Sequence, residues 1–231
     1  TVTGVQTCAL PISHVKLSVP EGKKIDTLVI NGVECEPYLT SDHRVMIERG
    51  EEMLVGIRIL KKALGVERVL IGIEQNKPDA IEYVSTLTDQ EEGIGVYPLK
   101  VKYPQGGEKQ LIKALLDREV PSGGLPLDVG VVVHNVGTAL AVYEAVQKNK
   151  PLIERVVTVT GKSLSKPSNF LVRIGTPVRD LIEAAGGLPE DTGKVVGGGP
   201  MMGKALSSLD VPVVKRTSGI LVIPEKEAQR A

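Results

Sequence analysis

The chain has 231 residues, of which 42% are hydrophobic, and its 28 basic side chains balance 28 acidic ones. This length holds one large domain or two ordinary ones, and the hydrophobic share is enough for a core, so a disordered tail is excluded. A net charge of zero and an aromatic share of 3% argue against a nucleic-acid partner, which needs basic patches or stacking platforms. No window approaches the roughly 18 unbroken apolar residues of a membrane span.

The first twelve residues differ from the rest of the chain. Residues 1–12 show no periodicity, and they lack the basic region and long apolar core of a secretory signal. We interpret them as a non-native leader that looks like translated adapter sequence; an unusual native disordered leader is the alternative. The two cysteines, Cys8 in this leader and Cys35, are too few for a zinc or iron–sulfur site, so we expect no metal site and a reducing compartment.

From Asp26 to about Gln147, short apolar runs alternate with helical patterns. Helix-breaking Gly50 is a weak point in the first of these helices, and Gly65 ends it. The alternation indicates a parallel α/β sheet with right-handed crossovers. Strands are expected at 26–31, 68–73, 94–101 and 128–134, and helices at about 41–64, 78–87, 108–116 and up to 147.

Beyond Lys148–Pro151 the pattern changes to shorter strands with one helix. Thr176 and Pro177 are expected as the N-cap and first residue of a helix that ends near Ala185. This order is the plan of a small α+β domain, for which a beta-grasp fold is the natural candidate. Strands are expected at 155–160, 170–174, 194–196 and 219–223.

Three polar turns follow three of the strands expected in the first part: Asn31–Pro37, Gln105–Glu108 and His134–Thr138. In an open parallel sheet, ligands bind at the edge where the carboxyl ends of the strands meet. Amide side chains and helix N-terminal N–H groups would suit a flat polar ring with a phosphate tail. Ordinary turns remain the alternative on spacing alone. The chain has no G-x-G-x-x-G and no P-loop, which excludes a standard dinucleotide fold and a nucleotide triphosphatase.

The stretch Asn31–Arg44 is similar to a stretch of the C subunit of the Rnf ion-translocating electron-transport complex, and further similar segments follow in the family's order at 103–111, 120–126, 135–138 and 198–203. The resemblance covers about 13–230 and relates the chain to the flavin-binding subunit of respiratory NADH dehydrogenase. It implies a Rossmann-like FMN/NADH domain over 13–150 without its glycine-rich loop, and a soluble-ligand-binding beta-grasp (SLBB-like) domain over 151–224. Residues 225–231 would begin the linker to an iron–sulfur domain.

The resemblance also implies flavin contacts at the three turns. Asn31 would hydrogen-bond the flavin, with Glu34 in the loop beside it. Asn135 and Thr138 would face the FMN ring and its phosphate side.

Two further turn residues and one carboxylate complete the implied site. Gly107 and Glu108 would approach the isoalloxazine and the ribityl chain. By the same resemblance, Glu36 would lie beside the nicotinamide as the catalytic residue. A carboxylate there would disfavour extra negative charge on a flavin that receives a hydride. The sequence departs from the wider superfamily at His134, where Asn is frequent, and at Lys109, which replaces a second Glu.

The activity implied by the resemblance is that of one subunit of an NADH/ferredoxin oxidoreductase, with FMN as cofactor and NAD(H) as substrate. The full-length protein would carry two 4Fe–4S clusters whose ligands follow Ala231, so we expect this chain to be a fragment that is inactive alone. Its partners would be the other Rnf subunits and, indirectly, ferredoxin. The protein would be peripheral on the cytoplasmic face of the plasma membrane and would have no membrane-spanning segment of its own. The alternatives are a corrinoid-reducing flavoprotein of the same superfamily and a non-catalytic docking module.

Overall fold

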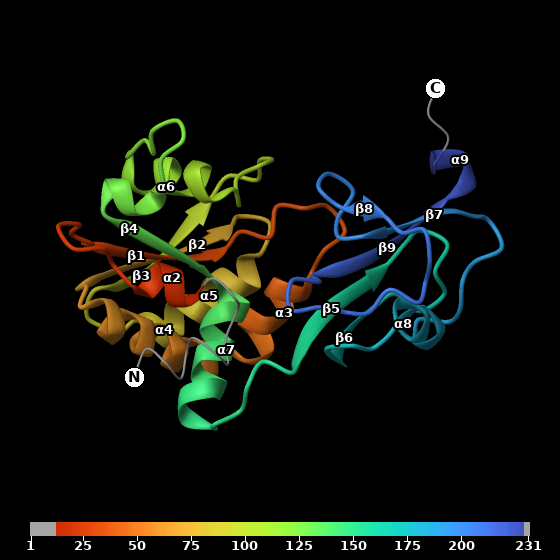
Figure 1. Cartoon of the computed structure of the whole chain (residues 1–231), viewed down its shortest axis with the longest axis horizontal. Coiled ribbons are helices and arrows are strands. Elements are labelled where there is room, and N and C mark those ends of the chain that lie inside the picture. Colours follow the sequence, from red (N-terminus) through yellow and green to blue (C-terminus); the bar gives the residue numbers. More distant parts are fainter. Residues whose placement is uncertain (1–12, 229–231) are drawn as a thin grey trace. The chain divides into compact units, whose positions relative to one another are not determined.

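The computed structural model describes residues 13–228, which form two compact units (Figure 1). Within these residues, the first unit comprises 13–35 and 42–152, and the second comprises 36–41 and 153–228. The short segment 36–41 therefore belongs by its contacts to the second unit, although the residues on both sides of it belong to the first. The predicted leader and Cys8 lie outside the described residues.

The first unit is a parallel sheet covered by helices on both faces. Its strands follow the order β3-β2-β1-β4, and every neighbouring pair is parallel, as predicted. Two buried side-chain clusters place α4, α5 and α7 on one face and α6 on the other (Figure 1). The elements are α2 (Ser13–Leu17), β1 (Thr27–Gly32), α3 (Ser41–Glu48), α4 (Gly50–Leu64), β2 (Arg68–Glu74), α5 (Pro78–Thr88), β3 (Ile94–Leu99), α6 (Glu108–Leu116), a 3-10 turn η1 (Pro126–Val129), β4 (Val131–Asn135) and α7 (Val136–Gln147).

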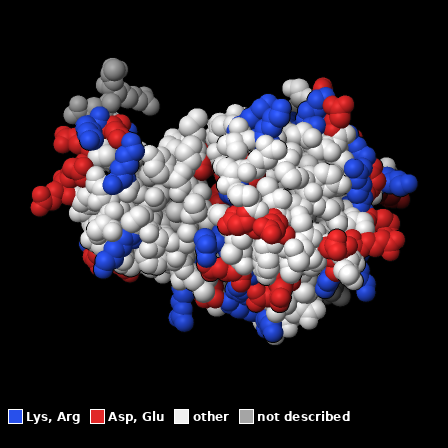
Figure 2. Space-filling view, turned by 180° about the vertical axis from the view of Figure 1, so that it is seen from behind, with Lys and Arg blue, Asp and Glu red and all other residues white. Residues whose placement is uncertain are grey.

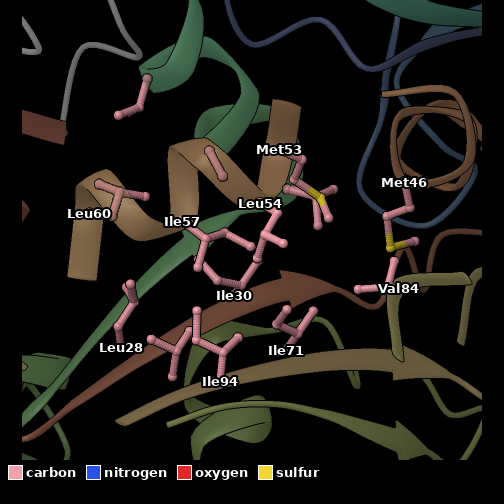
Figure 3. Close-up of a cluster of buried hydrophobic side chains, with 14 of the residues drawn as sticks. Leu28, Ile30, Met46, Met53, Leu54, Ile57, Leu60, Ile71, Val84 and Ile94 are labelled. Carbon is pink, nitrogen blue, oxygen red and sulfur yellow. The ribbon is translucent and has the colours of Figure 1, made fainter. Parts of the chain in front are cut away.

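The larger cluster joins α4 to the centre of the sheet. Apolar residues of α4 recur every three or four positions and pack on β1 and β2, so that Ile57 lies over Ile30 (Figure 3). Behind this layer α4 meets α7 at Gly56, where a Cβ atom would stand 1.8 Å from the carbonyl oxygen of Ala139. Only glycine permits that approach of the two helix backbones.

The helix expected over 41–64 is two helices. The break falls at Arg49, next to the predicted weak point, and the second helix starts at Gly50. Gly50 is needed there because a Cβ would lie 2.7 Å from the ring of Tyr83 in α5. The predicted end is confirmed: Gly65 has φ 66° and donates its backbone N–H to the carbonyl groups of Lys61 and Lys62.

The second unit is a mixed sheet packed against one helix. Its strand order is β6-β5-β9-β7-β8, with β5 and β9 parallel and the other neighbours antiparallel. The predicted helix starts one residue later than expected, because Pro177 is the N-cap. The elements are β5 (Glu154–Thr160), β6 (Ser168–Arg173), α8 (Val178–Ala184), β7 (Thr192–Gly197), β8 (Lys204–Ala205), β9 (Gly219–Pro224) and α9 (Glu225–Ala228).

On the face shown in Figure 2, basic and acidic side chains are interspersed and do not gather by sign. Among residues 13–228, no helix combines the length and the apolar character that crossing a membrane requires.

Candidate functional site

The three polar turns meet in the first unit, at the carboxyl edge of its sheet. Asn31, near the end of β1, donates from Nδ2 to the carbonyl oxygen of Gly106 at 2.9 Å, which joins the first turn to the second. Its Oδ1 accepts the backbone N–H of Val33 at 3.1 Å. Asn31 is also the β-ladder partner of Asn135 at the end of β4, which joins the first turn to the third. Among residues 13–228 the bonds to Gly106 and Val33 are the only hydrogen bonds of this side chain, so the side-chain amide of Asn31 keeps one N–H and one lone pair for a further partner.

Asn135 fixes the start of α7. Its Oδ1 accepts the N–H of Gly137 at 2.7 Å, an N-cap bond, and its Nδ2 donates to Asp42 Oδ2 at 2.7 Å and, at 3.4 Å, to the carbonyl oxygen of Asn31. Thr138, in the first turn of the same helix, is buried. The third turn is therefore rigidly tied to β1 and to the start of α3.

Glu34 caps a helix. Its two carboxylate oxygens accept the backbone N–H groups of Asp42 and His43 at 2.9 and 3.1 Å, in the first turn of α3. A carboxylate is favourable there, because it satisfies two N–H groups that lack helical partners and faces the positive end of the helix dipole. In the structure Glu34 thus orders the loop that carries the first turn.

The second turn ends in the N-terminus of α6. Gly107 is the N-cap of this helix, and as a glycine it has no side chain with which to cap the first backbone N–H groups. A Cβ at Gly107 would stand 2.9 Å from the carbonyl oxygen of Pro104, so the tight turn favours glycine. Glu108 follows, and its Oε1 receives a 2.5 Å hydrogen bond from Lys16 Nζ, which also donates to the carbonyl oxygen of Val133 at 2.8 Å.

Sequence reasoning missed Lys16 as a site residue. It lies on the five-residue helix α2, which packs against β4 and brings a positive charge to the carboxyl edge of the sheet. The available signal was its place in His14–Leu17, at the start of the region that the resemblance covers.

His134 is the second unexpected feature of this edge. Its side chain is buried, and among the described residues its Nε2 has no hydrogen-bond partner. Burial, and secondarily the nearby charge of Lys16, lower the pKa of the imidazole to about 3, so that it is neutral at physiological pH. The hydroxyl of Ser13 is also buried without a partner in the described part of the chain. Unsatisfied buried polar groups are uncommon in native proteins, and a bound polar ligand would satisfy them.

The donor set suits FMN. A lysine ammonium and a helix N-terminus without a side-chain cap favour an anionic group, while the amide of Asn31 and the neutral imidazole of His134 suit the polar edge of a ring. Between residues 13 and 228, no three His, Cys, Asp or Glu side chains gather in a way that would hold a metal ion. Cys35 packs in the loop, near Gly106, where a Cβ would meet its Sγ at 3.1 Å.

Glu36 differs from the other predicted site residues in the unit to which its contacts assign it. All six predicted flavin-binding residues belong to the first unit, whereas Glu36 belongs to the second. Its carboxylate accepts the backbone N–H of Met201 at 3.0 Å.

The family described as the Nuo51 FMN-binding domain matches residues 2–144, which is more than half of the chain. The chain belongs to this family. A second match, described as the SLBB domain, covers residues 156–205, where the second unit forms most of its mixed sheet and α8. These matches and the two observed sheets confirm the predicted fold: a Rossmann-like parallel sheet of the flavin-subunit type followed by an SLBB domain.

Curated relatives confirm the resemblance to the C subunit of Rnf-type complexes. The C subunit of the proton-translocating ferredoxin:NAD(+) oxidoreductase complex of Clostridium ljungdahlii is 48% identical over 226 residues, which are 98% of this chain and 49% of the relative. The C subunit of the Na(+)-translocating ferredoxin:NAD(+) oxidoreductase complex of Acetobacterium woodii is 47% identical, with 95% and 49% covered. The C subunit of an ion-translocating oxidoreductase complex of Rhodobacter capsulatus is 45% identical, with 95% and 42% covered. The chain spans about half the length of the curated relatives it matches.

Solved structures share the fold of this Nuo51-family chain. A chain of the NAD+-reducing [NiFe]-hydrogenase in its H2-reduced state superposes with a TM-score of 0.76 at 19% identity, covering 97% of this chain and 46% of that chain. The air-oxidised state gives a TM-score of 0.74 at 20% identity. At these identities the likeness shows the fold alone.

Proposed function

We propose that the carboxyl edge of the first unit binds FMN, and that the whole protein passes electrons between NAD(H) and ferredoxin as the C subunit of an Rnf-type ion-translocating complex. The observation that carries the proposal is the junction of the three turns around Asn31. At the neighbouring strand end lie Lys16 and His134, whose Nε2 has no hydrogen-bond partner among residues 13–228. The family match and the printed names of the relatives support it. Those names refer to members of ion-translocating complexes, which favours this function over a corrinoid-reducing flavoprotein.

Each residue of the edge has a role in this proposal. Lys16 and the N-terminus of α6 hold the negative charge of the ligand, and Gly107 lets the backbone come close to it. The remaining N–H of Asn31 and the neutral His134 orient the ring edge. Glu34 keeps the first turn ordered through the start of α3.

The other predicted residues have supporting roles. Asn135 and Thr138 shape the floor of the site from the start of α7, and Glu108 orients Lys16 through their ion pair. Glu36 supplies a fixed negative charge that acts on the nicotinamide, in the role implied by the resemblance. FMN, when bound, supplies the hydride-accepting chemistry.

The properties of the whole protein are part of the same proposal. NAD(H) is the substrate, and two 4Fe–4S clusters are bound by parts of the protein outside residues 13–228. The other members of the complex are direct partners, ferredoxin is an indirect one, and the protein is peripheral on the inner face of the plasma membrane. On this proposal the described chain alone does not complete the reaction.

The test is a titration of the purified chain with FMN and with riboflavin, followed by quenching of flavin fluorescence. Lys16→Met is expected to weaken FMN binding about ten- to hundredfold, the equivalent of one charge-assisted hydrogen bond, while riboflavin binding changes little. Lys113→Met is the matched control, since Lys113 lies on exposed α6 surface and pairs with Asp117 and Glu119. Absence of quenching in this chain and in a protein of the relatives' full length would contradict the proposal and favour a docking module.

A further inference from the structure

The second unit contains a hollow of about 270 Å³ beside the end of β7 and the start of β9. All of its lining residues belong to this unit. Buried Val178 and Ile220 and half-buried Leu206 form part of an apolar lining. Val211 and Val214, which also line it, remain 37% and 49% exposed. Ligand pockets usually measure about 300–1,000 Å³, so this hollow suits a small ligand with an apolar body.

Backbone hydrogen bonds hold the walls of the hollow in place. One wall is the chain at 211–214, which is tied to the start of α8 by a 3.0 Å bond from Val178 N–H to the carbonyl oxygen of Val211. The other wall follows β7, and there the N–H of Gly198 donates to the carbonyl oxygen of Gly219 at 2.7 Å. A ligand therefore meets a surface that is already ordered, which lowers the entropic cost of binding.

Arg216 brings a positive charge to the hollow. Its side chain is exposed, and among residues 13–228 it forms no hydrogen bond and no ion pair. The turn that carries it is closed by two bonds: Thr217 N–H donates to the carbonyl oxygen of Val214 at 2.9 Å, and Val214 N–H donates to the Thr217 hydroxyl at 3.0 Å. The planar guanidinium offers several N–H groups in a fork that matches a carboxylate. These donors are available to a ligand in the hollow.

The chain around the hollow is basic. Residues 192–224, which supply nearly all of the lining, include four basic side chains and one acidic side chain, Asp210. Asp210 is paired with Arg179 at 2.7 Å. Glu36, which belongs to the same unit, is bonded to the backbone N–H of Met201 at 3.0 Å. Both carboxylates thus have partners of their own, and the charge of the hollow favours an anionic ligand.

We propose that this hollow binds a small monocarboxylate with an apolar chain, whose carboxylate pairs with Arg216 while its chain lies against Val178, Leu206 and Ile220. Such a molecule covers the apolar walls and gives the guanidinium a partner, whereas an uncharged apolar molecule or a bare anion does only one of the two. Among the described residues that line the hollow, only Arg216 is charged, which favours one carboxylate over the several charges of a nucleotide phosphate. The site lies within the second unit and does not depend on the proposed flavin binding.

The test is a titration of the purified chain with hexanoate, without flavin, followed by the methyl signals of valine, leucine and isoleucine in NMR spectra. The signals of Val214 and Ile220 should shift and reach saturation. Affinity should rise about fourfold for each methylene in the series from acetate to hexanoate, because each methylene leaves water for the apolar lining. Affinity that is the same for acetate and hexanoate, or an absence of hexanoate binding, would overturn the proposal.

Two variants separate the charge from the apolar surface. Arg216→Met should weaken hexanoate binding about tenfold or more, the loss of one charge-assisted hydrogen bond, and should change the binding of uncharged hexan-1-ol less than about twofold. Arg173→Met is the matched control, because Arg173 is exposed on β6, at the opposite edge of the sheet from β8, and does not line the hollow. Equal losses of hexanoate affinity in the two variants, or shifts confined to methyl groups outside the hollow, would also contradict the proposal.

Discussion

The amide of Asn31 donates a 2.9 Å hydrogen bond to the carbonyl oxygen of Gly106, so that one side chain ties the end of β1 to the turn before α6. The same side chain accepts the N–H of Val33, and both hydrogen bonds are partly buried. Asn31 is therefore both a candidate flavin-binding residue and the residue that holds two of the three turns together.

Asn31→Ala is expected to destabilise the first unit by about 1–3 kcal/mol, because it leaves the Gly106 carbonyl and the Val33 N–H without their partner. FMN affinity should fall with it. Urea unfolding and flavin titration would measure the two effects. Asn31→Asp keeps the acceptor for Val33 and loses the donor to Gly106, so it should retain part of the stability; full stability in the alanine variant would show that the tie carries no energy.

Glu34→Ala is expected to cost about 0.5–2 kcal/mol of stability, since two N–H groups of the first turn of α3 lose their acceptor. Glu34→Gln should cost less, because an amide oxygen still accepts one of these bonds but the favourable charge at the helix N-terminus is gone. Thermal unfolding followed by circular dichroism would rank the three proteins. An alanine variant as stable as the parent would contradict the capping role.

The turns could be predicted to meet because their position follows from topology. Strand and helix alternate along the sequence, which specifies a parallel sheet, and in such a sheet the segments after Asn31 and His134 must leave from the same edge. The hydrogen bond from Asn31 to Gly106 shows that the first and second turns do lie together at this edge. The resemblance then supplied the flavin, which the turns alone do not specify.

The position of Glu36 in the second unit could not be predicted in this way. Its partner is a backbone N–H 165 residues further along the chain, and a backbone group has no sequence signature. Lys16 was missed for a related reason, because α2 is too short for a recognisable helical pattern. The helix break at Arg49, by contrast, lies next to the weak point predicted at Gly50; only the contact that requires glycine there, with the ring of Tyr83 in α5, is tertiary.

Gly56→Ala should strongly destabilise the first unit, by about 3 kcal/mol or more, since the new methyl group would stand 1.8 Å from the carbonyl oxygen of Ala139. A backbone atom cannot move aside as a side chain can, so α4 and α7 would have to separate. Gly95→Ala is the control, because its Cβ would meet the ring of half-exposed Tyr97 at 3.2 Å. Equal unfolding midpoints for the two variants would contradict the close helix approach.

His134 predicts how stability depends on pH. In the folded chain the pKa of its imidazole is lowered from 6.5 to about 3 by burial and by Lys16, so between these values the unfolded chain binds a proton that the folded chain does not. Stability due to the neutral imidazole is therefore complete above pH 6.5 and falls as the pH drops from there toward 3, by up to about 1.4 kcal/mol per pH unit. Urea unfolding between pH 7 and pH 5 would measure the slope. His134→Asn should flatten this slope between pH 7 and pH 5. The control is the same substitution at His43, a histidine that is paired with Asp79 at 2.9 Å. An unchanged slope in His134→Asn would show that the buried imidazole is not the group that titrates.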